Sequence, residues 1–197
     1  MEAGPRVVLL AAGASERLGE PKALVDLGGL SAIERLLAAC GDPAPLVVAG
    51  AHFEAIHAAV SDRAEVINHT AWAAGRTGSV ARAVTHLGES DLLLAPVDCP
   101  LVPAAVFDAL RSAWRGASSP PHGWLAPRDL ASGRHGHPVC FGASLALELT
   151  LMDPSHPLRG LRSKASPLLE VALDCPLILD DLDTPEDWAA WRRETGR

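Results

Sequence analysis

The chain has 197 residues, which suits one domain with a sizeable core, and its 48% hydrophobic content with 21% charged residues argues against disorder. The net charge of −7 argues against a general nucleic-acid surface, because binding a nucleic-acid backbone needs a broad basic patch. No apolar run has the length of a membrane span, and no signal-like segment precedes the first apolar run. The four cysteines show neither zinc-site spacing nor a close pair, so we expect them to be reduced thiols. Taken together, these observations predict a cytoplasmic protein that binds neither nucleic acid nor membrane.

In the first 115 residues, short apolar runs alternate with amphipathic segments. We predict strands at 7–12, 46–50, 65–68 and 91–97, with helices after Ser31, at 53–60, after Ser79 and from Pro103. Pro96 suggests that the fourth strand lies at an edge or ends early, since proline donates nothing to a ladder. The alternation predicts an α/β fold of three layers, with a doubly wound, mostly parallel sheet.

The remainder of the chain begins with a segment rich in glycine and proline at 116–123. Two short strands at 123–127 and 138–141 predict a small hairpin or lid, followed by helices at 144–151 and 157–165 and a strand at 168–173. Thr184 and Asp187 form a capping-box pattern at the start of a last helix. We interpret 1–197 as a single domain made of two halves, 1–115 and 116–197.

The loop after the first strand has the composition of an anion site. Gly13 and Gly19 allow positive φ and close approach of a ligand, Ser15 offers a hydroxyl, and Arg17 and Lys22 supply positive charge. The spacing matches neither the dinucleotide fingerprint nor the P-loop. Without further evidence, a glycine-rich turn with solvated charges remains the alternative.

Three aspartates outside this loop are candidates for contact with a ligand. Asp98 follows a buried strand, and open α/β sheets bind ligands at the carboxyl ends of their strands. Asp181 and Asp183 precede the last helix and are not explained by capping. Ser79 is the expected N-cap of a helix whose first amides would point at a ligand.

These stretches together resemble the MobA-like nucleotidyltransferases, in four ordered blocks at 10–22, 68–79, 98–102 and 181–187. The resemblance implies that Asp98 and Asp183 hold Mg²⁺, that Arg17, Lys22 and Asp98 are catalytic, and that His137 borders the acceptor. It further implies that the half at 1–115 binds the nucleotide and the half at 116–197 binds the acceptor. It also implies a set of nucleotide-binding residues: Leu10, Ala11, Ala12, Gly13, Ser15, Arg17, Lys22, Asn68, Gly78 and Ser79.

By the same resemblance, the activity is transfer of a nucleoside monophosphate from an NTP to a phosphate-bearing acceptor, with release of pyrophosphate. Ala11-Ala12 is typical of members that use CTP or UTP, and molybdopterin is the expected acceptor, as in molybdenum cofactor cytidylyltransferases. Two alternatives remain open. One is a cytidylyl- or uridylyltransferase acting on a sugar phosphate or phosphocholine, and the other is a non-catalytic chaperone that delivers molybdopterin to a molybdoenzyme partner.

Overall fold

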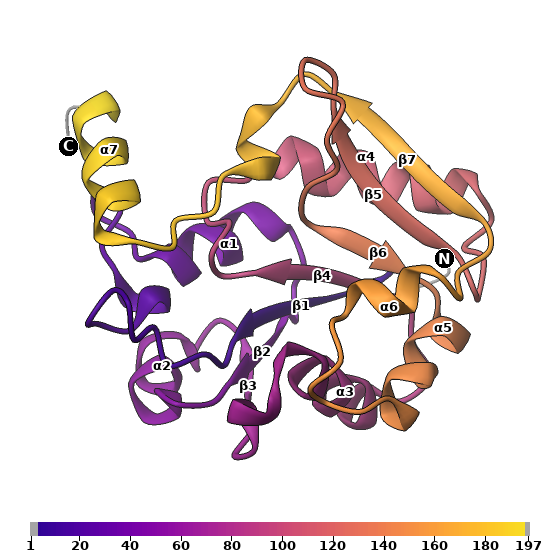
Figure 1. The fold of residues 1–197 in the computed structure, drawn as a ribbon, viewed down its shortest axis with the longest axis horizontal. Helices are drawn as coiled ribbons and strands as arrows, with labels where there is room; N and C mark the ends of the chain where they lie inside the picture. Colours follow the sequence, from indigo (N-terminus) through magenta and orange to yellow (C-terminus); the bar gives the residue numbers. More distant parts are fainter. Residues whose placement is uncertain (1–3, 196–197) are drawn as a thin grey trace.

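The computed structural model describes residues 4–195, and its strands form one seven-stranded sheet in the order β3-β2-β1-β4-β6-β5-β7 (Figure 1). β6 pairs antiparallel with both of its neighbours, whereas the other neighbouring strands pair in parallel. The mostly parallel α/β fold expected from the sequence is therefore confirmed. The strands are β1 (Arg6–Ala11), β2 (Leu46–Ala49), β3 (Glu65–Asn68), β4 (Leu92–Pro96), β5 (Trp124–Asp129), β6 (Val139–Phe141) and β7 (Leu168–Leu173).

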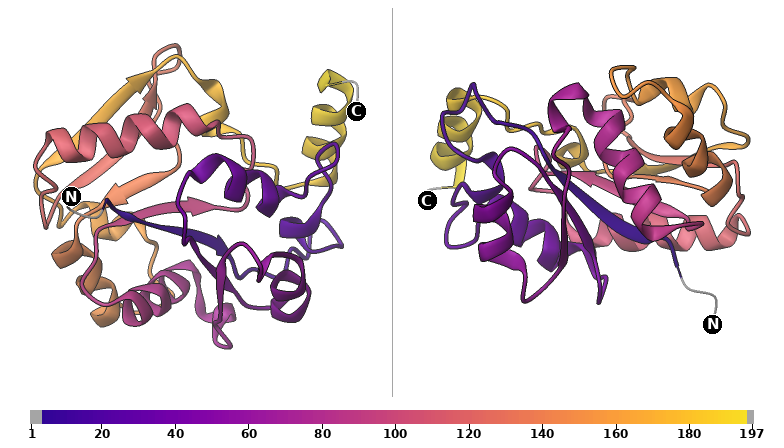
Figure 2. Two further views of the ribbon diagram at one scale, coloured as in Figure 1. Left: turned by 180° about the vertical axis from the view of Figure 1, so that it is seen from behind. Right: turned by 90° about the horizontal axis from the view of Figure 1, so that it is seen from below.

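Helices cover both faces of the sheet. One face packs against α1 (Ala32–Cys40), α2 (Phe53–Val60) and α4 (Ala104–Gly116), and α7 (Pro185–Thr195) joins the same apolar cluster through Trp188 and Trp191. The other packs against α3 (Arg76–Leu87), α5 (Ala143–Leu147) and the short α6 (Arg159–Arg162). Seen from behind, α1 and α4 lie across the near face of the strands (Figure 2, left). Four 3₁₀ turns complete the order: η1 (Lys22–Leu24), η2 (Trp72–Ala74), η3 (Glu148–Leu151) and η4 (Pro176–Leu179).

β1 is the centre of the core because its side chains alternate between two apolar clusters. Val7 and Leu9 pack on the α1 and α4 side, and Val8 and Leu10 on the α3 side. A strand buried on both faces appears in sequence as a continuous apolar run, which explains why this element is predictable.

Helix starts follow the predicted capping signals only in part. At α1, the Glu34 carboxylate accepts hydrogen bonds from the backbone amide and the hydroxyl of Ser31, so the capping box is confirmed. At α7, the Asp187 carboxylate accepts a hydrogen bond from the Thr184 amide, and the Thr184 hydroxyl accepts one from the Asp187 amide, so this capping box is also present. Pro103 is the N-cap of α4 and not its first helical residue.

The structure corrects several expected elements. Pro96 is the last residue of β4, which lies between β1 and β6 within the sheet, so the expected edge position is wrong. The proline is tolerated because β6 pairs only with Leu92–Leu94 and stops short of it. β5 and β6 form an antiparallel pair as expected, but β6 inserts beside β4 within the main sheet. The helix expected at 144–151 is split into α5 and η3, and the one expected at 157–165 shrinks to α6.

The two predicted halves share the sheet, since β1–β4 come from residues 1–115 and β5–β7 from residues 116–197. Their separate roles remain a prediction. Cys40, Cys99, Cys140 and Cys175 are free thiols. Among residues 4–195, no helix combines the length and apolar character needed to cross a bilayer.

Candidate active site

A cavity of about 470 Å³ opens at the carboxyl ends of β1 and β4, which run side by side in register from Arg6–Leu92 to Leu10–Pro96. Its volume is in the usual range for small-molecule sites. Most of the predicted site residues line it: Leu10, Ala11, Ala12, Gly13, Ser15, Arg17, Lys22, Ser79, Asp98 and Asp183. The sheet topology therefore brings residues from all four sequence blocks to one place.

The loop after β1 is organised by Ser15. Its hydroxyl accepts a hydrogen bond from the backbone amide of Lys22 at 3.0 Å, and its carbonyl accepts from the amides of Leu18 and Gly19. Positive φ occurs at Ser15 (56°) and Gly19 (78°) but not at Gly13, so that part of the prediction is wrong. Gly13 instead faces open space, because a Cβ built there would meet nothing within 4 Å. The space in front of this glycine lets a ligand approach the backbone closely.

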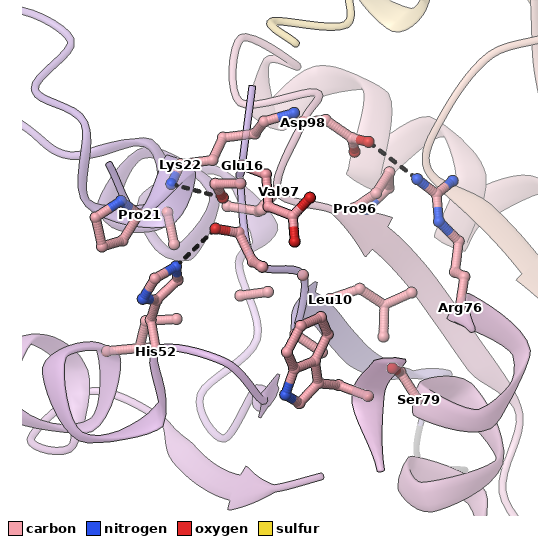
Figure 3. A pocket seen from close by; sticks show the side chains of 18 of the residues that line it. Leu10, Glu16, Pro21, Lys22, His52, Arg76, Ser79, Pro96, Val97 and Asp98 are labelled. Atoms are coloured by element: carbon pink, nitrogen blue, oxygen red, sulfur yellow. Dashed lines mark hydrogen bonds and ion pairs between the residues drawn. The ribbon is translucent and has the colours of Figure 1, made fainter. Parts of the chain in front are cut away.

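His52 supports this loop from the end of β2, a role that the sequence did not indicate. Its Nε2 lies 2.9 Å from the carbonyl oxygen of Ala14, and the ring lines the cavity (Figure 3). The neighbouring Gly50 is required sterically, since a Cβ there would lie 2.5 Å from the Ala12 carbonyl and 2.7 Å from Trp72. Its position in the sequence could have indicated a place near the site, because His52 follows the carboxyl end of a buried parallel strand.

α3 starts four residues earlier than predicted, at Arg76 and not after Ser79. The N-cap is Gly75, whose φ of 138° ends η2 and turns the chain into the helix at Arg76. Ser79 is therefore a buried first-turn residue that lines the cavity, and its expected role as N-cap is wrong. Ser79 therefore contributes its side chain to the cavity lining. The backbone amides at the start of α3 that have no partner within the helix belong to the residues before Ser79.

Asp98 lies two residues beyond β4 and is mostly buried, with 16% of its side chain exposed. Its Oδ2 accepts a hydrogen bond from Nη2 of Arg76 at 3.0 Å (Figure 3). Its Oδ1 is buried and has no hydrogen-bond partner among residues 4–195. A buried, unpartnered carboxylate oxygen is costly unless a further ligand satisfies it.

Cys99 and Asp181 lie beside Asp98, and one potential ligand atom from each of the three falls within 4.8 Å of the others. The Cys99 thiol donates to Oδ1 of Asp181 at 3.0 Å. Burial, followed by the hydrogen bond to Asp181, raises the pKa of Cys99, so this thiol is neutral at physiological pH. The backbone amide of Leu182 donates to the Asp98 carbonyl at 2.8 Å and fixes this segment against β4.

Asp183 occupies a different position from its neighbour Asp181. Its carboxylate forms an ion pair with Nζ of Lys22, and Nη2 of Arg17 lies 3.6 Å from its other oxygen. The last segment of the chain thus reaches the loop after β1 and contacts both predicted phosphate-binding cations. It is Asp181 that the structure places next to Asp98.

The remaining predicted residues lie outside the cavity lining. Asn68 is exposed at the end of β3, and Gly78 is buried within α3. His137 lies beside the Asp98 cluster, with its amide donating to the Ile178 carbonyl at 2.9 Å and its Nδ1 buried without a partner among the described residues. Burial lowers the pKa of His137, so its ring is neutral at neutral pH. Their predicted contacts with nucleotide or acceptor stay predictions.

Comparison with known protein families identifies the family of this chain. The model of the MobA-like NTP transferase domain matches residues 7–171, which is more than half of the chain. The chain belongs to this family. The resemblance noted from the sequence blocks is thereby confirmed at the level of the family, and the chain is a nucleotidyltransferase by membership.

Solved structures share the fold of this MobA-like chain at low sequence identity. Rv0371c from Mycobacterium tuberculosis is 23% identical, with a TM-score of 0.78 over 97% of this chain and 98% of its own, and it is also known as a manganese complex. A nucleotidyl transferase from Methanothermobacter is 22% identical, with a TM-score of 0.78 over 97% of each chain. The molybdopterin-guanine dinucleotide biosynthesis protein A of Archaeoglobus fulgidus is 21% identical, with a TM-score of 0.70 over 97% of this chain and 98% of its own. A search of curated protein sequences finds no match.

Proposed function

We propose that this protein transfers CMP from CTP to molybdopterin and releases pyrophosphate, with Mg²⁺ as its cofactor. The observation that carries the proposal is one cavity that holds both a phosphate-binding loop and a carboxylate suited to a divalent ion. Ala11 and Ala12 support CTP through the family resemblance. A molybdopterin-type acceptor is supported by the similarity to the A. fulgidus protein, which is a molybdopterin-guanine dinucleotide biosynthesis protein.

The residues present fit a magnesium ion. Mg²⁺ prefers carboxylate oxygens, and Asp98 offers a buried oxygen with no hydrogen-bond partner among residues 4–195. The second carboxylate would come from the last segment, where Asp183 lines the cavity and Asp181 lies beside Asp98. We retain Asp183 as the proposed second ligand because it shares the cavity with the phosphate-binding loop. Such an ion neutralises charge on phosphate oxygens as pyrophosphate leaves.

The chain's own cations would position the triphosphate. Lys22 and Arg17 line the cavity beside Asp183 and Arg76 lines it beside Asp98, so charge on the leaving group can be neutralised at more than one point. Gly13 faces open space, so phosphate oxygens can approach the backbone closely at this position. Preorganised donors of this kind usually supply the largest part of catalysis in such transfers.

The acceptor needs little activation. A phosphate monoester is largely dianionic at neutral pH, since its second pKa is about 6, and it can attack without a general base. This agrees with a neutral, buried His137, which we propose as an acceptor contact and not as a base. The reduced, mostly buried thiols suit the cytoplasm, where we expect the reaction to occur.

Pyrophosphate release tests this proposal directly. The protein would be incubated with each of the four NTPs, Mg²⁺ and molybdopterin, with sugar phosphates and phosphocholine as alternative acceptors. We expect release with CTP and molybdopterin. Release only with another acceptor would favour the sugar-phosphate or phosphocholine alternative, and tight CTP binding without any release would favour the molybdopterin chaperone.

A further inference from the structure

Arg76 is placed to control the carboxylate of Asp98. It is the first residue of α3, it lines the cavity, and its side chain points to the Asp98 carboxylate, as Figure 3 shows. Nη2 of Arg76 lies 3.0 Å from Oδ2 of Asp98. The arginine side chain is 53% exposed and the aspartate 16% exposed, so the guanidinium closes the solvent side of a mostly buried acid.

The two oxygens of Asp98 therefore have different surroundings. Oδ2 is hydrogen-bonded to Arg76, and Oδ1 is buried without a partner among residues 4–195. A cation bound to Oδ1 would share one negative charge with the guanidinium. Because the two positive charges repel each other at short range, Arg76 lowers the affinity of Asp98 for a metal ion.

The same pattern recurs at the second acidic residue of the cavity. Asp183 is paired with Lys22 and lies close to Arg17. Both carboxylates that we assign to the metal are thus neutralised by cations that we assign to the phosphates. The charged side chains of the cavity stay the same when ligands bind, but they would exchange partners with the charges of the triphosphate and the metal ion.

We propose that Arg76 is a positioning residue that couples metal binding to nucleotide binding. This inference rests on the proposed function. In the nucleotide-free protein the guanidinium fixes the Asp98 carboxylate and occupies one of its oxygens. A triphosphate offers the guanidinium another anion, and Asp98 is then available to the ion that accompanies the nucleotide. Coupling of this kind is reciprocal, so metal and nucleotide each raise the affinity for the other.

A purely structural role for Arg76 predicts the opposite result. Removing a partner that only orients a metal ligand typically weakens metal binding, by about 10- to 100-fold. Removing a competing cation strengthens it. The sign of the change in metal affinity therefore separates the two roles.

The test is a Mn²⁺ titration followed by electron paramagnetic resonance, without nucleotide, on the wild type and on Arg76→Gln, Arg76→Lys and Arg115→Gln. Arg115 is exposed on α4 and away from the cavity lining, so it controls for the loss of one positive charge. Asp98→Asn identifies the site that is titrated. Thermal unfolding followed by circular dichroism confirms that each variant is folded.

We expect Arg76→Gln to bind Mn²⁺ about three- to tenfold more tightly than the wild type, since a half-exposed guanidinium acts through a largely aqueous medium. Arg76→Lys and Arg115→Gln should remain within about twofold of the wild type, and Asp98→Asn should abolish binding at this site. Unchanged or weaker Mn²⁺ binding by Arg76→Gln overturns the proposal. So does an Arg76→Lys variant that binds as tightly as Arg76→Gln.

Coupling is measured with a non-hydrolysable CTP analogue, as the ratio of its affinities with and without Mn²⁺. Chelation in solution is the same for every protein and cancels in the comparison. The ratio should fall by about three- to tenfold in Arg76→Gln, and an unchanged ratio contradicts the inference. A wild type that releases no pyrophosphate defeats the proposed function, while the Mn²⁺ titration still decides the role of Arg76.

Discussion

Replacing Lys22 with alanine removes the most enclosed cation of the cavity. Only 12% of its side chain is exposed, and its amine pairs with Asp183. A unit charge at about 4 Å from a phosphate oxygen contributes on the order of 4 kcal/mol at the effective dielectric constant of a protein surface. The substitution also leaves Asp183 with only Arg17, 3.6 Å away, so a partly uncompensated carboxylate faces the triphosphate.

These two effects predict a loss of about 10²- to 10³-fold in kcat/KM for CTP, equal to about 3 to 4 kcal/mol of transition-state stabilisation. The assay is continuous pyrophosphate release with saturating acceptor. Lys164→Ala is the matched control, because Lys164 is an exposed lysine whose partner, Glu148, lies outside the cavity lining. We expect the control to retain wild-type turnover.

The double variant Lys22→Ala with Asp183→Asn separates the two contributions. Removing the partly uncompensated carboxylate should recover part of the loss in KM, but kcat should stay at or below that of Lys22→Ala, because the cation at the leaving group and the proposed second metal ligand are then both missing. Near-normal turnover of Lys22→Ala would refute the assignment of this residue to the triphosphate.

Three further predictions concern the base, the helix cap and the core. Ala12→Gly should raise the ratio of GTP to CTP use by about tenfold in competition assays, because it removes a methyl group from the cavity lining, and an unchanged ratio would contradict the role of this residue in base choice. The hydrogen bonds from Ser31 and then Arg63 lower the pKa of Glu34 to about 2, so its stabilising effect is present above the unfolded pKa near 4.5 and is lost as pH falls toward 2. The free-energy difference between wild type and Glu34→Gln in urea unfolding should therefore shrink over that range, and a constant difference would count against the cap. Leu9→Ala, at a fully buried position of β1, should cost about 2–5 kcal/mol in the same assay, with a cost under about 1 kcal/mol being inconsistent with the packing.

The elements that could be predicted from sequence are those in which local signals and burial agree. β1 is a continuous apolar run because both faces are covered, and the loop that follows it keeps its functional residues contiguous. Asp98 was predictable for the same reason, since it directly follows a buried strand. Local sequence is enough to predict a site residue when that residue directly follows a recognisable buried strand.

The parts that were missed depend on contacts between distant segments. The start of α3 is set by the backbone of Gly75, and Ser79 gave a competing capping signal. The insertion of β6 beside β4 requires a strand from the second half of the chain, which no local pattern shows. Asp181 lies near Asp98, and Asp183 near Lys22, because the last segment of the chain passes the carboxyl ends of β4 and β1.

Transfer of label from CTP is the most direct test of the central claim that this cavity catalyses nucleotidyl transfer. The protein would be incubated with CTP carrying ³²P at the α-phosphate, Mg²⁺ and molybdopterin, and the products separated. We predict that label moves to the acceptor in amounts equal to the pyrophosphate released, and that Asp98→Asn stops both. Label that remains in CTP, or that appears only as free CMP, would contradict the account.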